Sequence, residues 1–94
     1  MPKTVPHTFE CPVAVRNLIA DMRGDELQGH LPLGFGLDLA LLMLRNDTAE
    51  MLRLHEQHAN AGWSQFCNND IREAERHKLA CDYILTANNM LNGV

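Results

Sequence analysis

The sequence predicts an all-α protein that consists of a short N-terminal helix, an apolar loop and a long antiparallel helical hairpin. Apolar side chains recur at alternating steps of four and three residues through 37–67, which is the spacing of one helix face. Asp70 begins an Asp-Ile-Arg-Glu segment that has the pattern of a helix capping box. The segment 71–91 that follows contains neither proline nor glycine, so its sequence favours one uninterrupted helix.

The chain of 94 residues is short enough to form one domain, which we take to span 1–94. Its hydrophobic content of 46% and charged content of 21% are those of a globular domain and exclude an intrinsically disordered chain. A chain of this size buries only about 60 to 70% of the surface that its unfolded form exposes. The core is therefore modest, and a partner chain or a metal ion would add to its stability.

The charge of the chain bears on the class of partner. The formal net charge is −4, and the eight Lys and Arg residues are spread singly along the sequence. Nucleic-acid affinity depends on clustered cations that displace counterions, so a nucleic-acid partner is disfavoured. An acidic surface suits a basic protein partner instead.

We expect a cytoplasmic protein without a membrane segment. The longest apolar run, 39–44, is far too short to span a bilayer, and the N-terminal region lacks a basic stretch followed by an apolar one. The three cysteines, Cys11, Cys67 and Cys81, are odd in number and widely spaced, with no CxxC pair. This usage favours reduced thiols in a reducing compartment.

The N-terminal part of the chain is predicted to contain one helix between two irregular segments. The segment 1–11 holds two prolines and no helical periodicity, so we expect an extended arm. Pro12 suits the first turn of a helix, and Gly24 suits its end, which predicts a helix over 12–23. The segment 24–36 is rich in glycine and is predicted to be an apolar loop.

The hairpin is predicted to consist of 37–67 and 71–91. The apolar stripe keeps its phase through Asn46 and Asp47, so we prefer a continuous or bent helix over 37–67. The alternative is a break at Asn46 and Asp47, because Asp47 also begins a capping box. The last helix begins after Asp70 and ends near Asn92-Gly93.

A continuous helix over 37–67 would extend beyond a domain of this size. Its length would be about 47 Å at 1.5 Å per residue. Either the helix breaks, or a second copy of the chain covers the exposed part of its apolar stripe. We expect the fold to be completed by self-association and the protein to be a homo-oligomer.

Four side chains in the predicted hairpin have the arrangement of a metal site. Pairing the helices about a turn at Asn68-Asn69 places His55 opposite Cys81 or Asp82, and His58 opposite His77 or its neighbours. The candidate ligands, which would hold zinc as a structural ion, are His55, His58, His77 and Cys81. The favoured interpretation is structural, with His58 and His77 at the edge of the stripe and hydrogen-bonded to Glu56, Glu73 or water, and with Cys81 as a small buried residue.

Trp63, Phe66 and Tyr83 are three of only five aromatic residues, and all three fall on the hairpin. We expect Trp63 and Phe66 to fill the core at the closed end of the hairpin. Tyr83 lies off the main stripe of its helix, which predicts an exposed position. Aromatic residues and arginine are enriched in protein interfaces, so the candidate partner contacts are Tyr83, Trp63 and Arg53.

The sequence favours a non-enzymatic helical interaction protein that binds a protein partner and regulates or inhibits it as a homo-oligomer. No catalytic constellation is evident, because HEQH at 55–58 lacks metalloprotease spacing and Cys81 lacks the surroundings that activate a thiol. The alternative is a small ligand-binding or metal-binding protein with the His/Cys site described above. A helix-turn-helix role is disfavoured, because Glu50 and Glu56 flank Arg53.

Overall fold

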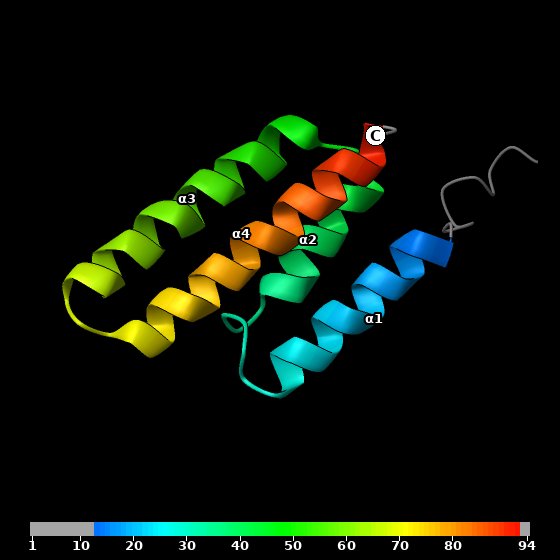
Figure 1. Cartoon of the computed structure of the whole chain (residues 1–94). Helices are drawn as coiled ribbons and strands as arrows, with labels where there is room; N and C mark the ends of the chain where they lie inside the picture. The colour runs from blue at the N-terminus through cyan, green and yellow to red at the C-terminus, as the bar shows by residue number, and fades with distance from the viewer. Residues whose placement is uncertain (1–12, 93–94) are drawn as a thin grey trace, which may run out of the picture.

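The computed structural model describes residues 13–92, and over this range it contains four α-helices and no strand. The helices are α1 (Val13–Leu27), α2 (Phe35–Leu44), α3 (Thr48–Cys67) and α4 (Ile71–Leu91) (Figure 1). The predicted all-α class and the antiparallel hairpin of α3 and α4 are confirmed. The predicted arm at 1–11 and the predicted first helical residue, Pro12, lie outside the described residues.

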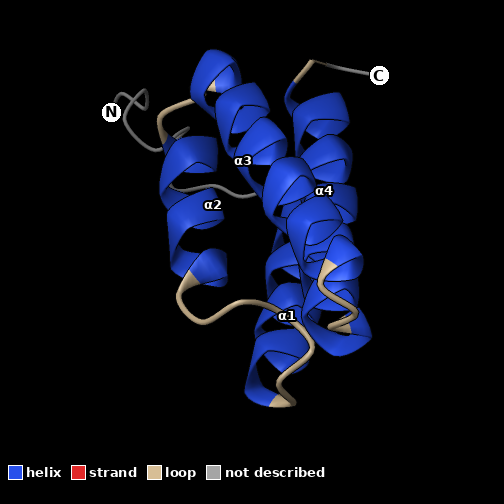
Figure 2. Cartoon of the chain, turned by 90° about the vertical axis from the view of Figure 1, so that its left-hand side faces the viewer, coloured by secondary structure: helices blue, strands red, loops and turns tan. Residues whose placement is uncertain are grey.

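The two long helices α3 and α4 lie side by side along their whole length. The helices α2 and α4 form the centre of the molecule, and α1 and α3 flank them on opposite sides (Figures 1 and 2). Five large side chains are fully buried where these helices meet: Phe35, Met22, Leu39, Met51 and Ile84. The core draws on all four helices, so no helix is an appendage.

Each of the first three helices ends at a residue in the left-handed region. These residues are Gly29, Asn46 and Asn69, with φ angles of 80°, 54° and 69°. The N–H group that follows each of them donates to the carbonyl oxygen five residues earlier, at 2.8 to 3.0 Å. This is the hydrogen-bond pattern of a Schellman motif, which satisfies the last carbonyl groups of a helix.

Asp47 and Asp70 begin the next helix directly after two of these stops. The Asp47 carboxylate accepts a hydrogen bond from the Glu50 N–H at 3.1 Å, and the Asp70 carboxylate accepts one from the Glu73 N–H at 3.2 Å. A carboxylate at this position satisfies an N–H group that has no partner inside the helix. Each Asn-Asp pair therefore ends one helix and starts another.

The preferred prediction of a continuous or bent helix over 37–67 is wrong, and the alternative break is the one observed. Asn46 adopts its left-handed conformation between α2 and α3. The change of direction there turns a different face of α2 to the core, which buries Leu39 and Leu42 and leaves Leu37 exposed. The apolar residues keep their helical spacing in the sequence across Asn46, but the helix itself does not continue, so the residues on the two sides do not share one face.

The predicted end of the first helix and the predicted extent of the loop are also wrong. Gly24 lies inside α1, which continues to Leu27, and α2 begins at Phe35, inside the segment predicted as loop. A glycine within a helix costs only about 1 kcal/mol. Contacts of the last turn of α1 with the rest of the protein offset this cost, because Asp25 and Glu26 both bind groups outside α1.

Glu26 connects α1 to the beginning of α2. Its carboxylate accepts hydrogen bonds from the N–H groups of Gly34 and Gly36, both at 3.0 Å. A carboxylate is stabilising at a helix N-terminus because the unpaired N–H groups there carry partial positive charge. Any side chain at Gly36 would collide with this carboxylate, since a Cβ there would lie 2.5 Å from Glu26 Oε1. The Gly34-Phe35-Gly36 segment thus lets Glu26 approach the backbone.

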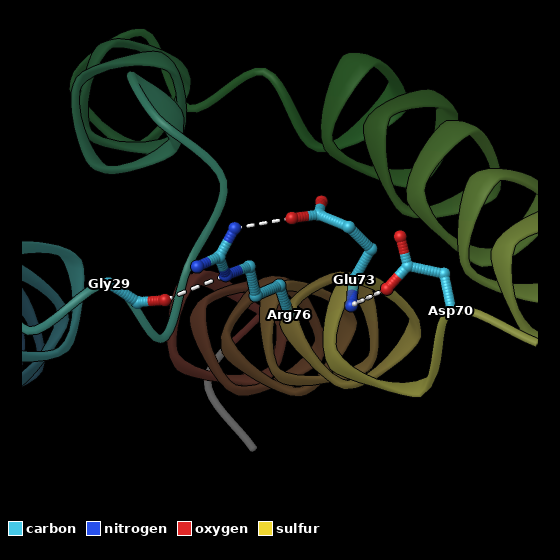
Figure 3. A network of polar contacts seen from close by, with 4 residues as sticks. All are labelled: Gly29, Asp70, Glu73 and Arg76. Carbon is cyan, nitrogen blue, oxygen red and sulfur yellow. Dashed lines mark hydrogen bonds and ion pairs between the residues drawn. The ribbon is translucent and has the colours of Figure 1, made fainter.

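Arg76 connects the loop between α1 and α2 to α4. Its Nε donates to the carbonyl oxygen of Gly29 at 2.8 Å, and its Nη1 pairs with the carboxylate of Glu73 (Figure 3). The backbone N–H of Glu73 is in turn bound by Asp70. The residue that starts α4 and the arginine that holds the loop therefore share one network.

Candidate functional site

The helices α3 and α4 pack tightly against each other at Gly62. A Cβ atom at this position would lie 3.1 Å from His77 Cβ and 3.5 Å from the carbonyl oxygen of Ala74. Only glycine leaves room for this packing without a shift of the neighbouring helix. The predicted partner helix over 71–91 is observed as α4, and it packs beside His58 through His77 and beside His55 through Cys81.

His58 and His77 form a hydrogen-bonded pair between α3 and α4. Their Nδ1 atoms lie 2.8 Å apart, and the ring centroids are 5.1 Å apart. The edge of the Phe35 ring packs against His58 from α2, with centroids 5.2 Å apart and the rings nearly perpendicular. The predicted register between the two histidines is therefore correct.

The surroundings of His58 favour its neutral form. Burial lowers the pKa of His58, and the nearby His77 and His55 lower it further, while Asp38 from α2 opposes the shift. Because one Nδ1 atom of the pair must donate and the other must accept, the contact holds only while at least one ring is neutral. The pair is thus a structural element of the α3–α4 packing near neutral pH.

Cys81 is buried and makes its contact with the backbone of α3. Its Sγ donates to the carbonyl oxygen of His55 at 3.6 Å. Burial raises the pKa of the Cys81 thiol, and the carboxylate of Asp82 raises it further. The group therefore stays a thiol near neutral pH, which disfavours both metal ligation and nucleophilic attack.

The candidate zinc ligands His55, His58, His77 and Cys81 do not converge as a set. The structure brings together the side chains of His58 and His77, while the Cys81 thiol is directed to the backbone oxygen of His55. Within residues 13–92, no three His, Cys, Asp or Glu side chains are arranged to hold a metal ion.

A groove of about 390 Å³ runs along the α3–α4 interface. Its walls are mainly apolar and are formed by His55, His58, Ala59, Gly62, Trp63, Phe66, Ala74, Lys78 and Cys81. Trp63 and Phe66 stack on each other at its edge, with ring centroids 5.7 Å apart. They are 67% and 53% exposed, so the prediction that they fill the core at the closed end is wrong.

The exposed apolar surface extends beyond the groove along both helices. Three further exposed side chains, Leu52, Ile71 and Leu85, lie at helical spacings from the groove residues. We call the groove together with Leu52, Trp63, Phe66, Ile71 and Leu85 the outer hairpin face. Exposed apolar side chains gathered on one side of two helices are typical of a binding site rather than of a solvated helix surface.

Helical spacing places acidic side chains beside the outer hairpin face. Glu56 comes four residues after Leu52, and Glu75 comes four residues after Ile71, and both are exposed. Asp82 is exposed four residues after Lys78, and its carboxylate lies 3.8 Å from Lys78 Nζ. By helical spacing these three carboxylates lie next to the face, although Glu56 and Glu75 also line other hollows, and Lys78 is the one cation among the groove residues.

The other two predicted partner contacts lie elsewhere. Tyr83 is half-buried rather than exposed, and its hydroxyl donates to the carboxylate of Asp25 in α1. Arg53 is exposed, pairs with Glu50 and lines a different hollow, between α2 and α3. The outer hairpin face therefore contains Trp63 but neither Tyr83 nor Arg53.

The sequence-based reasoning missed a second apolar surface. Five exposed leucines, Leu27, Leu33, Leu37, Leu41 and Leu44, lie on α1, on α2 and on the loop between them. We call them the leucine face. The number of leucines in this part of the sequence could have indicated an apolar surface. The continuous helix predicted for 37–67 instead assigned Leu37, Leu41 and Leu44 to the packed stripe of the hairpin.

Comparison of the chain with models of protein families, with curated proteins and with solved structures finds no significant match in any of the three. No described helix is both long enough and apolar enough to cross a membrane.

Proposed function

We propose that this protein is a non-enzymatic interaction protein that binds another protein through the outer hairpin face and thereby regulates or inhibits it. The observation that carries the proposal is the stacked pair of Trp63 and Phe66, more than half exposed at the edge of an apolar groove. Tryptophan and other large aromatic side chains supply much of the binding energy in protein interfaces.

The shape of the outer hairpin face suits a helix as the bound element. Two antiparallel helices that pack side by side leave a shallow channel between them, and the side chains of a third helix can fill such a channel. Gly62 and Ala74 keep this channel free of bulk in its middle, and Trp63 and Phe66 form its edge. An amphipathic helix would bring its apolar stripe into the groove.

The charges around the groove favour a basic partner. Glu56, Glu75 and Asp82 border the face, and the chain as a whole carries a net charge of −4. Complementary charges at the rim of an interface increase the association rate and set the orientation of the partner. The proposed partner segment is therefore an amphipathic helix whose apolar stripe is flanked by lysine or arginine.

We further propose that the protein acts as a homo-oligomer in the cytoplasm, where Cys67 and Cys81 remain reduced thiols. Self-association uses a surface other than the outer hairpin face, which leaves that face available for the regulated protein.

Affinity capture with matched variants tests the proposal. Three proteins are immobilised: the wild type, the double variant Trp63→Ala/Phe66→Ala and the exposed control Arg72→Ala. Each protein that they retain is purified, and its affinity for all three is measured by titration. We expect a protein that binds the wild type and Arg72→Ala equally, with an affinity for the double variant lower by at least about tenfold. Circular dichroism of each variant checks that the helices persist. Equal affinities of all three for every retained protein would overturn the proposal.

A further inference from the structure

We propose that a second copy of this chain docks on the leucine face, so that the two chains form a symmetric dimer. This inference rests on the self-association in the proposed function and assigns it to a surface. The leucine face consists of Leu27, Leu33, Leu37, Leu41 and Leu44, and it involves α1, α2 and the loop that joins them.

The amount of exposed apolar surface fits a dimer interface. Leu33 is 98% exposed and Leu27 is 83% exposed, which are the highest values among the large apolar side chains of the described residues. Together the five leucines expose on the order of 500 Å², which lies in the upper part of the roughly 300 to 600 Å² that the largest apolar patch of a monomer covers, and patches of this size are often functional. With the polar atoms around it, this surface approaches the roughly 800 Å² per partner that a stable interface buries.

The leucine face has both a projecting side chain and a hollow that can receive it. A groove of about 480 Å³ lies between α1 and α2, and Ile19, Met22, Leu27, Leu37 and Ala40 contribute its apolar walls. Leu33 stands at the edge of the same groove. In a two-fold dimer, each copy uses the same surface, so Leu33 of one copy can enter the groove of the other while the reverse contact forms.

The charges in this groove are self-complementary. Arg23 and Glu26 both line it, and Arg23 makes no ion pair with another described residue. The Glu26 carboxylate accepts two backbone N–H bonds but has further acceptor sites. A two-fold arrangement can place Arg23 of each copy beside Glu26 of the other, so each cation meets an anion.

The charges around the outer hairpin face are not self-complementary. This face is bordered by Glu56, Glu75 and Asp82, and its one cation, Lys78, already lies 3.8 Å from Asp82, so two copies that met there would bring together surfaces with an excess of negative charge. Like charges at an interface oppose association. Homodimer interfaces also favour an apolar, charge-poor centre, which the aliphatic side chains of the leucine face provide. The second copy therefore belongs on the leucine face and the regulated protein on the hairpin.

Two matched leucine variants and the single tryptophan of the chain test this assignment. Leu33→Glu places a charge on the leucine face, and Leu52→Glu places the same charge on the outer hairpin face at a side chain that is 50% exposed. Sedimentation equilibrium measures the dimer affinity of each protein. Trp63 is the only tryptophan, so its emission reports whether the outer hairpin face is covered in the dimer.

We expect the wild type and Leu52→Glu to dimerise alike, Leu33→Glu to dimerise at least about tenfold more weakly, and Trp63 emission to stay constant as the dimer forms. A monomeric wild type at every accessible concentration would overturn the inference. So would a dimer that Leu52→Glu dissociates and Leu33→Glu does not. Capture of a partner that depends on Trp63 and Phe66 would still support the proposed function in either case, so the two failures are distinguishable.

Discussion

The Nδ1 atoms of His58 and His77 lie 2.8 Å apart across the interface between α3 and α4. One ring donates and the other accepts, so the contact needs at least one neutral ring. The residues around His58 include Asp38 from α2 and His55 from its own helix. The outer hairpin face is built on this interface, so the protonation of the pair affects the surface as well as the stability.

Acidification should destabilise the protein through this pair. The pKa of His58 is lowered in the folded state, first by burial and then by His77. The unfolded chain therefore binds a proton at a higher pH than the folded one, and stability present above about pH 6.5 is lost as the pH falls below it. Urea unfolding of the wild type from pH 8 to pH 5 measures the loss. His77→Gln keeps a hydrogen-bonding side chain without a titrating ring, so its stability should depend less on pH than that of the wild type. An unchanged pH dependence in His77→Gln would refute this role for the pair.

Gly62→Ala and Gly24→Ala should differ although both replace a glycine within a helix. Alanine favours a helix over glycine by about 1 kcal/mol. Nothing lies within 4 Å of a Cβ at Gly24, so that variant should gain about this amount. A Cβ at Gly62 would lie 3.1 Å from His77 Cβ, and the strain should cancel or reverse the gain. Denaturant midpoints of both variants give the comparison, and equal stabilisation would contradict the close approach of α3 and α4.

Glu26→Gln should weaken the start of α2. The substitution removes the negative charge that faces the N–H groups of Gly34 and Gly36 while it keeps the size of the side chain. We expect a loss of about 1 kcal/mol in the free energy of unfolding, the usual magnitude for a helix N-cap. Glu75→Gln, at an exposed position on α4, is the control and should have little effect. Similar stabilities of the two variants would show that Glu26 does not act as a cap.

Tyr83→Phe should cost about 1 kcal/mol, because it removes the hydroxyl that donates to Asp25 and so weakens the contact between α4 and α1. Burial and the Asp25 carboxylate both raise the pKa of Tyr83. The unfolded chain therefore loses this proton first as the pH rises above about 10, and the wild type should lose stability there. Tyr83→Phe should lack that alkaline component. Thr86→Ala, which removes an exposed hydroxyl from the same helix, is the control. If both variants were as stable as the wild type, the contact with Asp25 would not contribute to the free energy of unfolding.

The parts of the fold that depend on local chemistry could be predicted from the sequence. Asp70 caps α4 as its capping box indicates, and α4 spans 71–91 as predicted. The turn at Asn68-Asn69 set the register that places His58 opposite His77. These features depend on residues close together in the chain, or on one turn whose length fixes the pairing of two helices.

The parts that depend on distant contacts could not be predicted. Gly24 has the features of a helix end, but α1 continues to Leu27 because Asp25 binds Tyr83, which is 58 residues away in sequence. Helical spacing assigned Trp63 and Phe66 to an apolar stripe without indicating which part of that stripe a neighbouring helix covers. Because the predicted helix is interrupted at Asn46, α2 packs behind the hairpin, and the outer part of the stripe is exposed.

The fluorescence of Trp63 reports directly on the proposed binding site, because this single tryptophan lies at the edge of the groove where the regulated protein is proposed to bind. The purified partner from the capture experiment is titrated into the wild type and into Phe66→Ala. The proposed binding site predicts a saturable shift of Trp63 emission to shorter wavelength in the wild type and binding at least about tenfold weaker in Phe66→Ala. Saturable binding that leaves Trp63 emission unchanged and has the same affinity in Phe66→Ala would contradict it.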